Sequence, residues 1–395
     1  MLKPSLAAAL IVIAAAPALA DCPVNNRYTL SFPSFGAQQL NYATSYTTTV
    51  SNPRGQSLTM GLSFSTFNLS SNQVSGLTMP QISTFINDGG TTNNNLIIGG
   101  TFAGRTTDVS ANTRTVVTRF TFSAPIHDFT IQVNDVDFLA DQFRDWIQVN
   151  GINGASNYDP VMTTPFGTNN TTAGPHSAAG SSLLLGAVSS PLSLTVRQAG
   201  GTAANNNNAN GGTFTAVFPA PVTEVDVRYG NFPLGSGETA TGQQAIGIQS
   251  VSFCPMPQLT VTKSSAPYAT GADDPNRFHI PDADMVYDII VSNSDASMIE
   301  LNALILTDVL PSAITFRNSD YDDGGPITTN FEFVPGSSGL TMASSDIAFS
   351  NNGGSSYGYA PAAGYDAAVN GIRLNPKGVM AANSSFTVRF RAKIK

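Results

Sequence analysis

Short runs of alternating apolar and polar residues, separated by polar turns, recur through this sequence from Arg27 onward. The clearest examples are residues 46–50, 57–64 and 114–122, and turns rich in Asn, Gly and Ser join them. A period of two is typical of a half-buried β-strand, because successive side chains point to opposite faces of a sheet. No window shows a sustained helical period with capping residues. The sequence therefore predicts an all-β protein, with a jelly-roll-like β-sandwich in its N-terminal part.

The chain also contains a clear break at Cys254-Pro-Met-Pro257. Two prolines flanking one residue cannot continue a strand ladder, because proline has no N–H to donate. The length of 395 residues also exceeds that of one typical domain. We therefore expect an N-terminal β-sandwich over residues 21–257 and a second β-sandwich domain over residues 258–395.

Residues 1–20 have the pattern of a signal peptide. Lys3 supplies the positive charge, residues 6–16 supply a short apolar core, and Ala18-Leu-Ala20 forms a small-x-small cleavage site. The pattern predicts an exported protein, periplasmic, secreted or at the cell surface, whose mature chain begins at Asp21 and has no transmembrane segment. A lipoprotein is the alternative, because Leu19-Ala-Asp-Cys22 has the outline of a lipobox, although Asp21 stands where that motif takes a small residue.

The sequence contains two cysteines, Cys22 and Cys254. In an exported protein they most simply form a disulfide, which here would close the N-terminal domain. A catalytic cysteine is the alternative, but neither residue has a recognisable motif around it.

Charge limits the partners of this chain. Charged residues are only 11% of the sequence, against about 25% in a usual soluble domain, and the formal net charge is -8. No basic run is present, so nucleic acid is not an expected partner. A surface rich in Ser, Thr, Asn and Gly is typical of an extracellular or periplasmic β protein.

Residues 258–395 contain a specific pattern. An alternating strand, 285–291, closes on Ser292-Asn293, and Thr307-Asp308-Val-Leu-Pro311 follows it. This pattern resembles the conserved-repeat domain of bacterial surface proteins, the domain-of-unknown-function family numbered eleven, and later segments fit it too: 314–316, 349–354, 371–374 and 386–390. The resemblance implies an immunoglobulin-like fold, often in secreted or surface-attached proteins, and it brings no catalytic residues. From the residues alone, Asp308 is placed to tie down a turn.

Catalytic motifs are weak in this chain. The three histidines have no metal-ligand spacing. Gly354-Ser-Ser-Tyr-Gly358 has the letters of a nucleophile elbow, but that motif needs a strand-to-helix turn and a downstream histidine, and no histidine follows His279. We expect a protein that is not an enzyme. A glycosidase that uses two carboxylates stays open, because only the fold sets their spacing.

Aspartates gather after the strand that contains Phe129, Ile131 and Val133. Extending the strand parity puts Asp135 and Asp137 on one side at the strand end, and two more follow on the way into the next strand. Carboxylates that converge repel one another unless a cation meets them, and hard oxygen ligands suit Ca²⁺. The predicted calcium ligands are Asp135, Asp137, Asp141 and Asp145. The alternative is that these residues cap turns and face water. No other cofactor is expected.

The position of the single tryptophan in its strand predicts which face of the sheet it occupies. Ile147 and Val149 occupy the core face of their strand, so Trp146, Gln148 and Asn150 lie on the other face. An exposed Trp beside amides is a surface on which a sugar ring stacks. The alternative is that a neighbouring loop covers it.

Two further patterns predict local structure. Phe122-Ser-Ala-Pro125 and Phe218-Pro-Ala-Pro221 both precede an apolar-alternating segment, and proline presets φ for a turn, so a hairpin-like corner is expected at each. Basic residues alternate with apolar ones in the last strand, at Arg389, Arg391, Lys393 and Lys395. This stripe is either the solvated face of an edge strand or a docking surface for an acidic polymer.

Together these observations favour an exported bacterial protein of two β-domains with a surface, adhesive or structural role, which would contact glycans or other surface proteins. The alternative is a carbohydrate-binding or glycan-hydrolysing module that uses Trp146 and the nearby aspartates.

Overall fold

The computed structural model describes residues 11–13, 22, 24–87, 92–104, 106, 113–139, 142–166, 169–173, 198–218, 220–231, 242–268, 278–293, 298–299 and 301–395. They form strands and two short 3-10 turns, Phe32–Ser34 and Ser344–Asp346. The predicted all-β class is confirmed, whereas the two-layer sandwich arrangement stays a prediction. Within these ranges no helix is long and apolar enough to cross a membrane.

The chain divides into two compact units. The N-terminal unit is Ala20–Met256, and the C-terminal unit is Pro257–Lys395 together with Met1–Leu19. The division falls at Pro257, beside the proline-flanked segment in the sequence.

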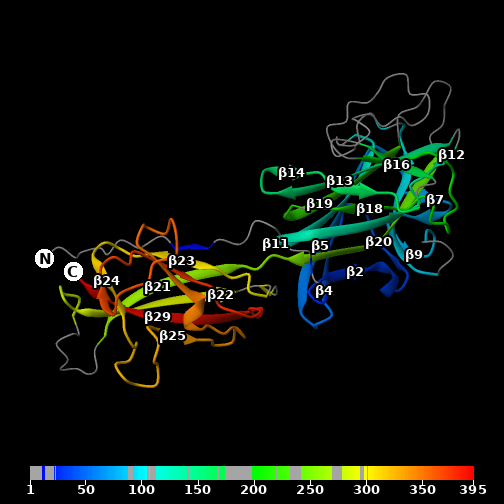
Figure 1. The fold of residues 1–395 in the computed structure, drawn as a ribbon. Coiled ribbons are helices and arrows are strands. Elements are labelled where there is room, and N and C mark those ends of the chain that lie inside the picture. Colours follow the sequence, from blue (N-terminus) through cyan, green and yellow to red (C-terminus); the bar gives the residue numbers. More distant parts are fainter. Residues whose placement is uncertain are drawn as a thin grey trace. The chain divides into compact units, whose positions relative to one another are not determined.

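The N-terminal unit consists of strands that differ widely in length, from two to 20 residues (Figure 1). Its strands are β2 (Tyr28–Ser31), β3 (Gln38–Gln39), β4 (Ser45–Ser51), β5 (Ser57–Phe67), β6 (Leu69–Ser71), β7 (Gln73–Val74), β8 (Leu77–Thr78), β9 (Gln81–Ser83), β10 (Asn95–Phe102), β11 (Thr115–Asn134), β12 (Phe138–Leu139), β13 (Phe143–Asn153), β14 (Ser156–Tyr158), β15 (Val161–Thr163), β16 (Asn170–Ala173), β17 (Gln198–Gly201), β18 (Phe214–Val217), β19 (Val222–Asn231) and β20 (Gln243–Pro255).

Strand β11 organises this unit, because it changes partners along its length. Its first half pairs with β5 on one side and β19 on the other, and its second half pairs with β18 and β20. All of these pairings are antiparallel. The strands of the unit, apart from the small β7–β8 pair, therefore join into one closed hydrogen-bonded network.

The corner predicted at Pro125 is wrong. Strand β11 runs through this residue without a turn, and the ladder to β19 shifts register between Thr121 and Ile126. A register shift removes the need for the N–H that proline lacks. At the second copy the chain does break, because β18 ends at Val217 and β19 begins at Val222.

The core of the N-terminal unit follows from strand alternation. Phe129, Ile131 and Val133 are fully buried at every second position of β11. Aromatic rings of β11, of β20 and of the residue that follows β18 meet there: Phe122 contacts Phe253 with ring centroids 4.7 Å apart, and Phe129 lies 6.0 Å from Phe218. Burial of this many apolar side chains is the main stabilising contribution of the unit.

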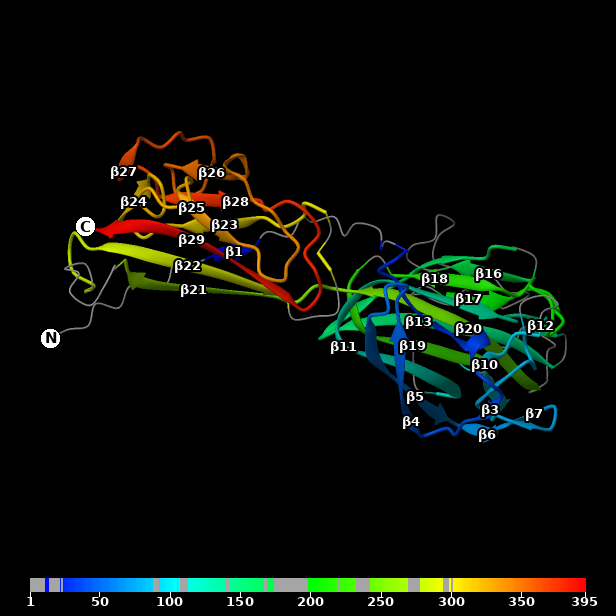
Figure 2. The same ribbon diagram turned by 90° about the horizontal axis from the view of Figure 1, so that it is seen from below.

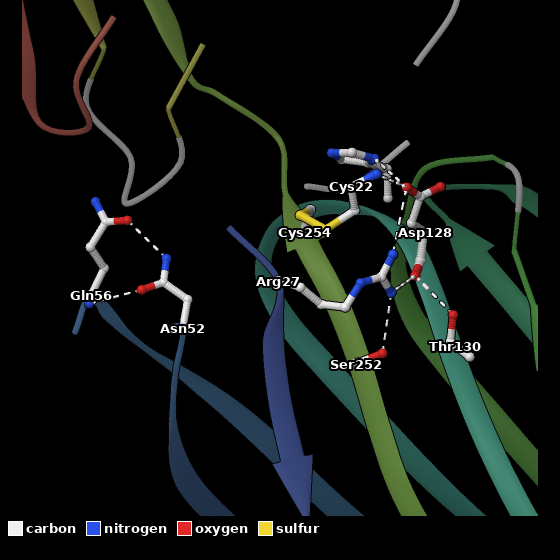
Figure 3. Close-up of a disulfide and its surroundings, with 9 residues drawn as sticks. Cys22, Arg27, Asn52, Gln56, Asp128, Thr130, Ser252 and Cys254 are labelled. Atoms are coloured by element: carbon white, nitrogen blue, oxygen red, sulfur yellow. Dashed lines mark hydrogen bonds and ion pairs between the residues drawn. A yellow bond between two sulfur atoms is a disulfide. The ribbon is translucent and has the colours of Figure 1, made fainter. Parts of the chain in front are cut away.

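The predicted disulfide is present between Cys22 and Cys254, whose Cα atoms are 5.8 Å apart. Figure 3 shows the bond beside Arg27 and Asp128. The backbone N–H of Cys22 donates to Asp128 Oδ2 over 2.5 Å, and Arg27 donates to Ser252 Oγ over 3.2 Å. In this state the Cys22 sulfur is bonded to Cys254, so it has no free valence for the thioether that a lipoprotein requires.

The C-terminal unit contains two sheets that share one core. Its strands are β1 (Ile11–Ile13), β21 (Leu259–Pro267), β22 (Asp284–Asn293), β23 (Leu306–Val309), β24 (Ile314–Asn318), β25 (Phe331–Val334), β26 (Ile347–Ser350), β27 (Gly364–Asp366), β28 (Gly371–Leu374) and β29 (Ser384–Ile394). One sheet has the order β21-β22-β29-β24-β27 with β25 also on β29, and the other has the order β1-β23-β28-β26. Figure 2 shows the long strands β21, β22 and β29 side by side. Met285, Tyr287, Ile289 and Val291 alternate into the core.

Strand β1 lies within the predicted signal peptide. It pairs antiparallel with β23, with Ile11 opposite Asp308 and Ile13 opposite Leu306. On its other side β23 pairs with β28. Removal of residues 1–20 would therefore leave β23 with one neighbouring strand instead of two.

The basic stripe of the last strand does not lie on an edge. Strand β29 pairs with β22 on one side and with β24 and β25 on the other. Arg391 is buried and donates to Asp284 Oδ2 over 2.8 Å and to Asp323 Oδ2 over 2.7 Å. Arg389 donates to Asp288 Oδ1 over 2.7 Å. The predicted edge is wrong, because β29 has paired strands on both sides. Carboxylates of neighbouring segments form ion pairs with both arginines.

Candidate functional site

The acidic segment begins where β11 ends, at Asn134. Asp135 adopts a left-handed conformation with φ of +65°, which Asp tolerates better than most residues. The next N–H, that of Val136, donates to the Gly212 carbonyl over 2.9 Å. Strand parity therefore stops before Asp135. The two aspartates that parity placed together, Asp135 and Asp137, nevertheless line one cavity because the loop turns there.

Asp145 joins them from the start of β13. Its N–H donates to the Asp137 carbonyl over 2.9 Å, and the Asp137 N–H donates to Asp145 Oδ2 over 3.0 Å. The hydroxyl of Tyr229 donates to Asp145 Oδ1 over 2.5 Å. Asp145 is fully buried, and both of its oxygens accept hydrogen bonds from the protein. The fourth predicted residue, Asp141, lies outside the described residues.

Asn205 bridges the other two carboxylates. Its backbone N–H donates to Asp137 Oδ2 over 2.7 Å, and its side-chain amide donates to Asp135 Oδ1 over 2.9 Å. Asn205 begins the run of four asparagines at 205–208, a loop that is long and polar in the sequence. Nothing in that run distinguishes Asn205 from its neighbours, so its role was not predicted.

The cavity beside these groups has a volume of about 230 Å³, and its lining includes Asp135, Asp137, Asn205 and Gln244. Gln244, on β20, is 1% exposed. Neither its amide nitrogen nor its amide oxygen has a hydrogen-bond partner in the part of the chain that the structure describes. A buried polar group without a partner costs about 1–3 kcal/mol, so a side chain retained in this state indicates a ligand or water that it contacts.

The carboxyl groups beside the cavity perturb one another. Among the described residues, no Lys, Arg or His forms an ion pair with Asp135, Asp137 or Asp145. Burial raises the pKa of Asp135 to about 6. Burial and the neighbouring Asp135 raise the pKa of Asp137 to about 7. Burial and Asp137 also raise the pKa of Asp145, and burial and Asp145 raise the pKa of Tyr229. A proton or a cation would relieve this repulsion.

The aspartates do not form a ready cage for a metal. In the described ranges, no group of three or more His, Cys, Asp or Glu side chains is placed to hold one ion. Both oxygens of Asp145 accept hydrogen bonds within the protein, so they do not point together with those of its neighbours. Calcium binding by the predicted set stays a prediction.

The second feature predicted from the sequence, an exposed Trp146, is wrong. Trp146 is 1% exposed, and it lies between Gly200 of β17 and Gly230 of β19. Gln148 is also buried, and Asn150 is half-buried with its amide donating to another residue, Asn157, over 2.9 Å. These three residues therefore form no exposed stacking surface.

A polar groove lies elsewhere on the strands that flank β11. It has a volume of about 240 Å³ and is lined by Ser63, Ser65, Phe67, Val117, Arg119 and Arg228. Arg119 makes a bidentate contact with Asp226, over 2.6 and 2.9 Å, and also meets Glu224 at 2.9 Å. The groove combines fixed planar charges, hydroxyl groups and one aromatic side chain.

Comparison with known proteins adds no family. A scan against protein-family models and a search of curated proteins found no match to this chain. The resemblance of residues 258–395 to the conserved-repeat domain therefore stays a prediction. Function has to be inferred from the geometry of the chain itself.

Proposed function

We propose that this chain is an exported, non-enzymatic bacterial protein with a structural or adhesive role outside the cytoplasm. The observation that supports it best is the disulfide between Cys22 and Cys254, which are 232 residues apart and both buried. Such bonds form and persist in oxidising compartments and are rare in the cytosol. The signal-peptide pattern of residues 1–20 supports the same conclusion.

Export is tested with the complete chain produced in a bacterial host and followed by cell fractionation. We expect a mature product that begins at Asp21 and that a thiol reagent does not modify before reduction. A matched control, Leu10→Arg, interrupts the apolar core of the signal and should keep the protein in the cytoplasm. A wild-type product that retains residues 1–20 and carries two reactive thiols would contradict the proposal.

The adhesive role requires binding without turnover. Support comes from the surface, which is rich in neutral polar residues, and from the polar groove lined by Arg119 and Arg228. Carbohydrate recognition at this groove is the second candidate function, because sugars are bound by fixed planar polar groups next to an aromatic face. Trp146 has no part in it.

A glycan array tests the second candidate directly. Ser65 is exposed and lines the groove, so Ser65→Trp fills the space without removing an ion pair. We expect glycan binding by the wild type that is lost in Ser65→Trp and kept in Ser51→Trp, an exposed position outside the groove. Retained binding in Ser65→Trp, or no binding by the wild type, would exclude the groove as a sugar site.

A further inference from the structure

We propose that Asp135, Asp137 and Gln244 bind one divalent cation, Ca²⁺ by preference, in the cavity at the end of β11. This site differs from the one predicted from the sequence, because it has two carboxylates and one amide instead of four carboxylates. It does not depend on the proposed adhesive role.

The carboxylates are arranged so that one oxygen of each stays available. Asp135 Oδ1 and Asp137 Oδ2 accept hydrogen bonds from Asn205, over 2.9 and 2.7 Å. Asp135 Oδ2 and Asp137 Oδ1 accept none from the described residues. Asn205 is thus a positioning residue that fixes both carboxylates and leaves one oxygen of each for a ligand.

Gln244 is the independent observation. Its side chain is 1% exposed, it lines the same cavity, and within the described ranges neither amide atom has a partner. An amide oxygen is a usual neutral ligand for Ca²⁺. A cation at this place would satisfy a polar group that the fold buries and otherwise leaves unpaired.

Charge and size both favour Ca²⁺. Two carboxylates match the charge of a divalent cation. Only oxygen ligands are offered, which suits a hard cation and not Zn²⁺. A water occupies about 30 Å³, so a cavity of about 230 Å³ admits an ion that keeps several waters. Ca²⁺ tolerates such irregular coordination better than Mg²⁺ does.

The test compares the full chain with and without Ca²⁺ at pH 7.5, by calorimetric titration and by thermal melting. We expect a dissociation constant on the order of 10⁻⁴–10⁻³ M, as in extracellular calcium modules, and a melting temperature of the N-terminal unit that rises with Ca²⁺. Asp137→Asn and Gln244→Ala should each weaken binding, the former at least tenfold because it removes one ligand charge. The control Asp320→Asn changes an exposed aspartate of the C-terminal unit and should bind as the wild type does.

A second measurement keeps the test valid if a variant fails to fold. Tb³⁺ replaces Ca²⁺ in oxygen sites and luminesces when a nearby aromatic ring is excited. The ring of Tyr229 lies behind the proposed ligands, because its hydroxyl donates to Asp145 and Asp145 accepts from the N–H of Asp137. We expect Tb³⁺ luminescence in the wild type that Ca²⁺ displaces. The highest ion concentration tested is about 10 mM, roughly ten times the largest dissociation constant expected. The proposal would be overturned if no binding heat, no shift in melting temperature and no luminescence were measured up to that concentration. Unchanged Ca²⁺ affinity in a folded Asp135→Asn/Asp137→Asn variant would overturn it as well, because the ion would then bind elsewhere.

Discussion

Strand alternation in the sequence predicts which face of the strand Trp146 lies on, but it does not predict whether the side chain is buried. Alternation correctly puts it on the face opposite Ile147 and Val149, but alternation says nothing about what covers that face. The side chain is 1% exposed, and the register partners of Trp146 on the two adjacent strands are Gly200 and Gly230. Those two strand neighbours come from sequence positions far from Trp146, so only the tertiary pairing supplies them.

The buried indole leads to a stability prediction. Trp146→Ala should lower the free energy of unfolding by about 3–5 kcal/mol, the range for removal of a large aromatic side chain from a core. Urea unfolding followed by far-UV circular dichroism measures this loss. Val161→Ala, at a position that is 50% exposed, is the control and should change stability by less than about 0.5 kcal/mol. Equal stability of the two variants would mean that the indole is not packed.

The aspartates predict a pH dependence in metal-free buffer. Asp135 and Asp137 have folded-state pKa values of about 6 and about 7, above the ordinary value of 3.8. A carboxyl with a raised pKa keeps its proton in the folded state after the unfolded chain has lost it. Its stabilising effect is therefore complete below 3.8 and is lost as the pH rises through the folded-state value.

The melting temperature of the N-terminal unit in metal-free buffer should accordingly fall between pH 4 and pH 8, the range that spans about 3.8 to about 7. The Asp135→Asn/Asp137→Asn variant lacks both titrating groups, so its profile should be flatter, with the largest gain over the wild type at pH 8. Differential scanning calorimetry resolves this difference. A wild-type profile as flat as that of the variant, or one that rises toward pH 8, would contradict the raised pKa values.

The residues that form the site around the cavity show which part of a site the sequence predicts. Asp135, Asp137 and Asp145 are close in the chain, so their meeting follows from one strand end and the start of the next strand. Asn205, Tyr229 and Gln244 come from segments roughly 60 to 110 residues away in the sequence. They are uncharged and resemble many other polar residues of this chain. Tyr229 lies on β19, Gln244 lies on β20 and Asn205 follows β17, so only the tertiary pairing of these strands brings the three residues to the aspartates.

At the scale of elements, β11 is the least predictable strand. Its two halves alternate clearly and are recognised separately, at 114–122 and 129–133. Pro125 suggests a turn between them, but a register shift accommodates it, and one strand of 20 residues results. The shift depends on the neighbouring strand β19, which local sequence does not describe.

Strand β17 lies so close to the acidic segment that Gly201, its last residue, should not tolerate a side chain. A Cβ added at Gly201 would overlap the backbone carbonyl of Asp137. Gly201→Ala should therefore displace the acidic segment, lower the stability of the N-terminal unit and weaken Ca²⁺ binding. Titration calorimetry and thermal melting report the two effects. The matched control is Gly36→Ala, because a Cβ at Gly36 meets nothing within 4 Å. If Gly201→Ala and Gly36→Ala had the same melting temperature and the same Ca²⁺ affinity, the close approach of Gly201 to Asp137 would be contradicted.

The two sheets of the C-terminal unit are joined by an ion pair. Lys263 of β21 meets Asp308 of β23 at 2.6 Å, with 14% and 3% of their side chains exposed, so Asp308 ties the sheets together and does not cap a turn as the sequence suggests. Removing one partner leaves the other buried and unpaired, which costs about 3–5 kcal/mol. Lys263→Met should show this cost in denaturant unfolding. The double variant Lys263→Met/Asp308→Leu should recover most of the lost free energy of unfolding. If the losses of the two single variants simply added in the double variant, the two residues would not interact.

At the scale of the whole molecule, the disulfide should stabilise one unit only. The closed loop lies within Ala20–Met256, and chain-entropy estimates for a loop of this size are on the order of 4–5 kcal/mol. Cys22→Ala/Cys254→Ala should therefore lower the melting temperature of the N-terminal unit and leave that of Pro257–Lys395 unchanged. Calorimetry of the double variant, with the reduced wild type as a control, measures this. A fall in both transitions would show that the units do not melt independently.

The broad plan of the molecule follows from sequence more readily than its sheets do. The all-β class follows from the period of two, and the prolines at 255 and 257 mark where the units divide. The closed strand network of the N-terminal unit and the pairing of β1 with β23 do not follow, because they depend on hydrogen bonds between segments distant in the chain.

The position of the disulfide also has a mechanical meaning. The Cα atoms of Cys22 and Cys254 are 5.8 Å apart, although a chain of 232 residues would extend to roughly 800 Å. In a mature chain that begins at Asp21, tension applied between the N-terminus and a point after Cys254 would pass through the sulfur–sulfur bond and bypass the strands between the two cysteines. While the bond is intact, the N-terminal unit adds no length under load and keeps its fold; reduction would make the same unit extensible.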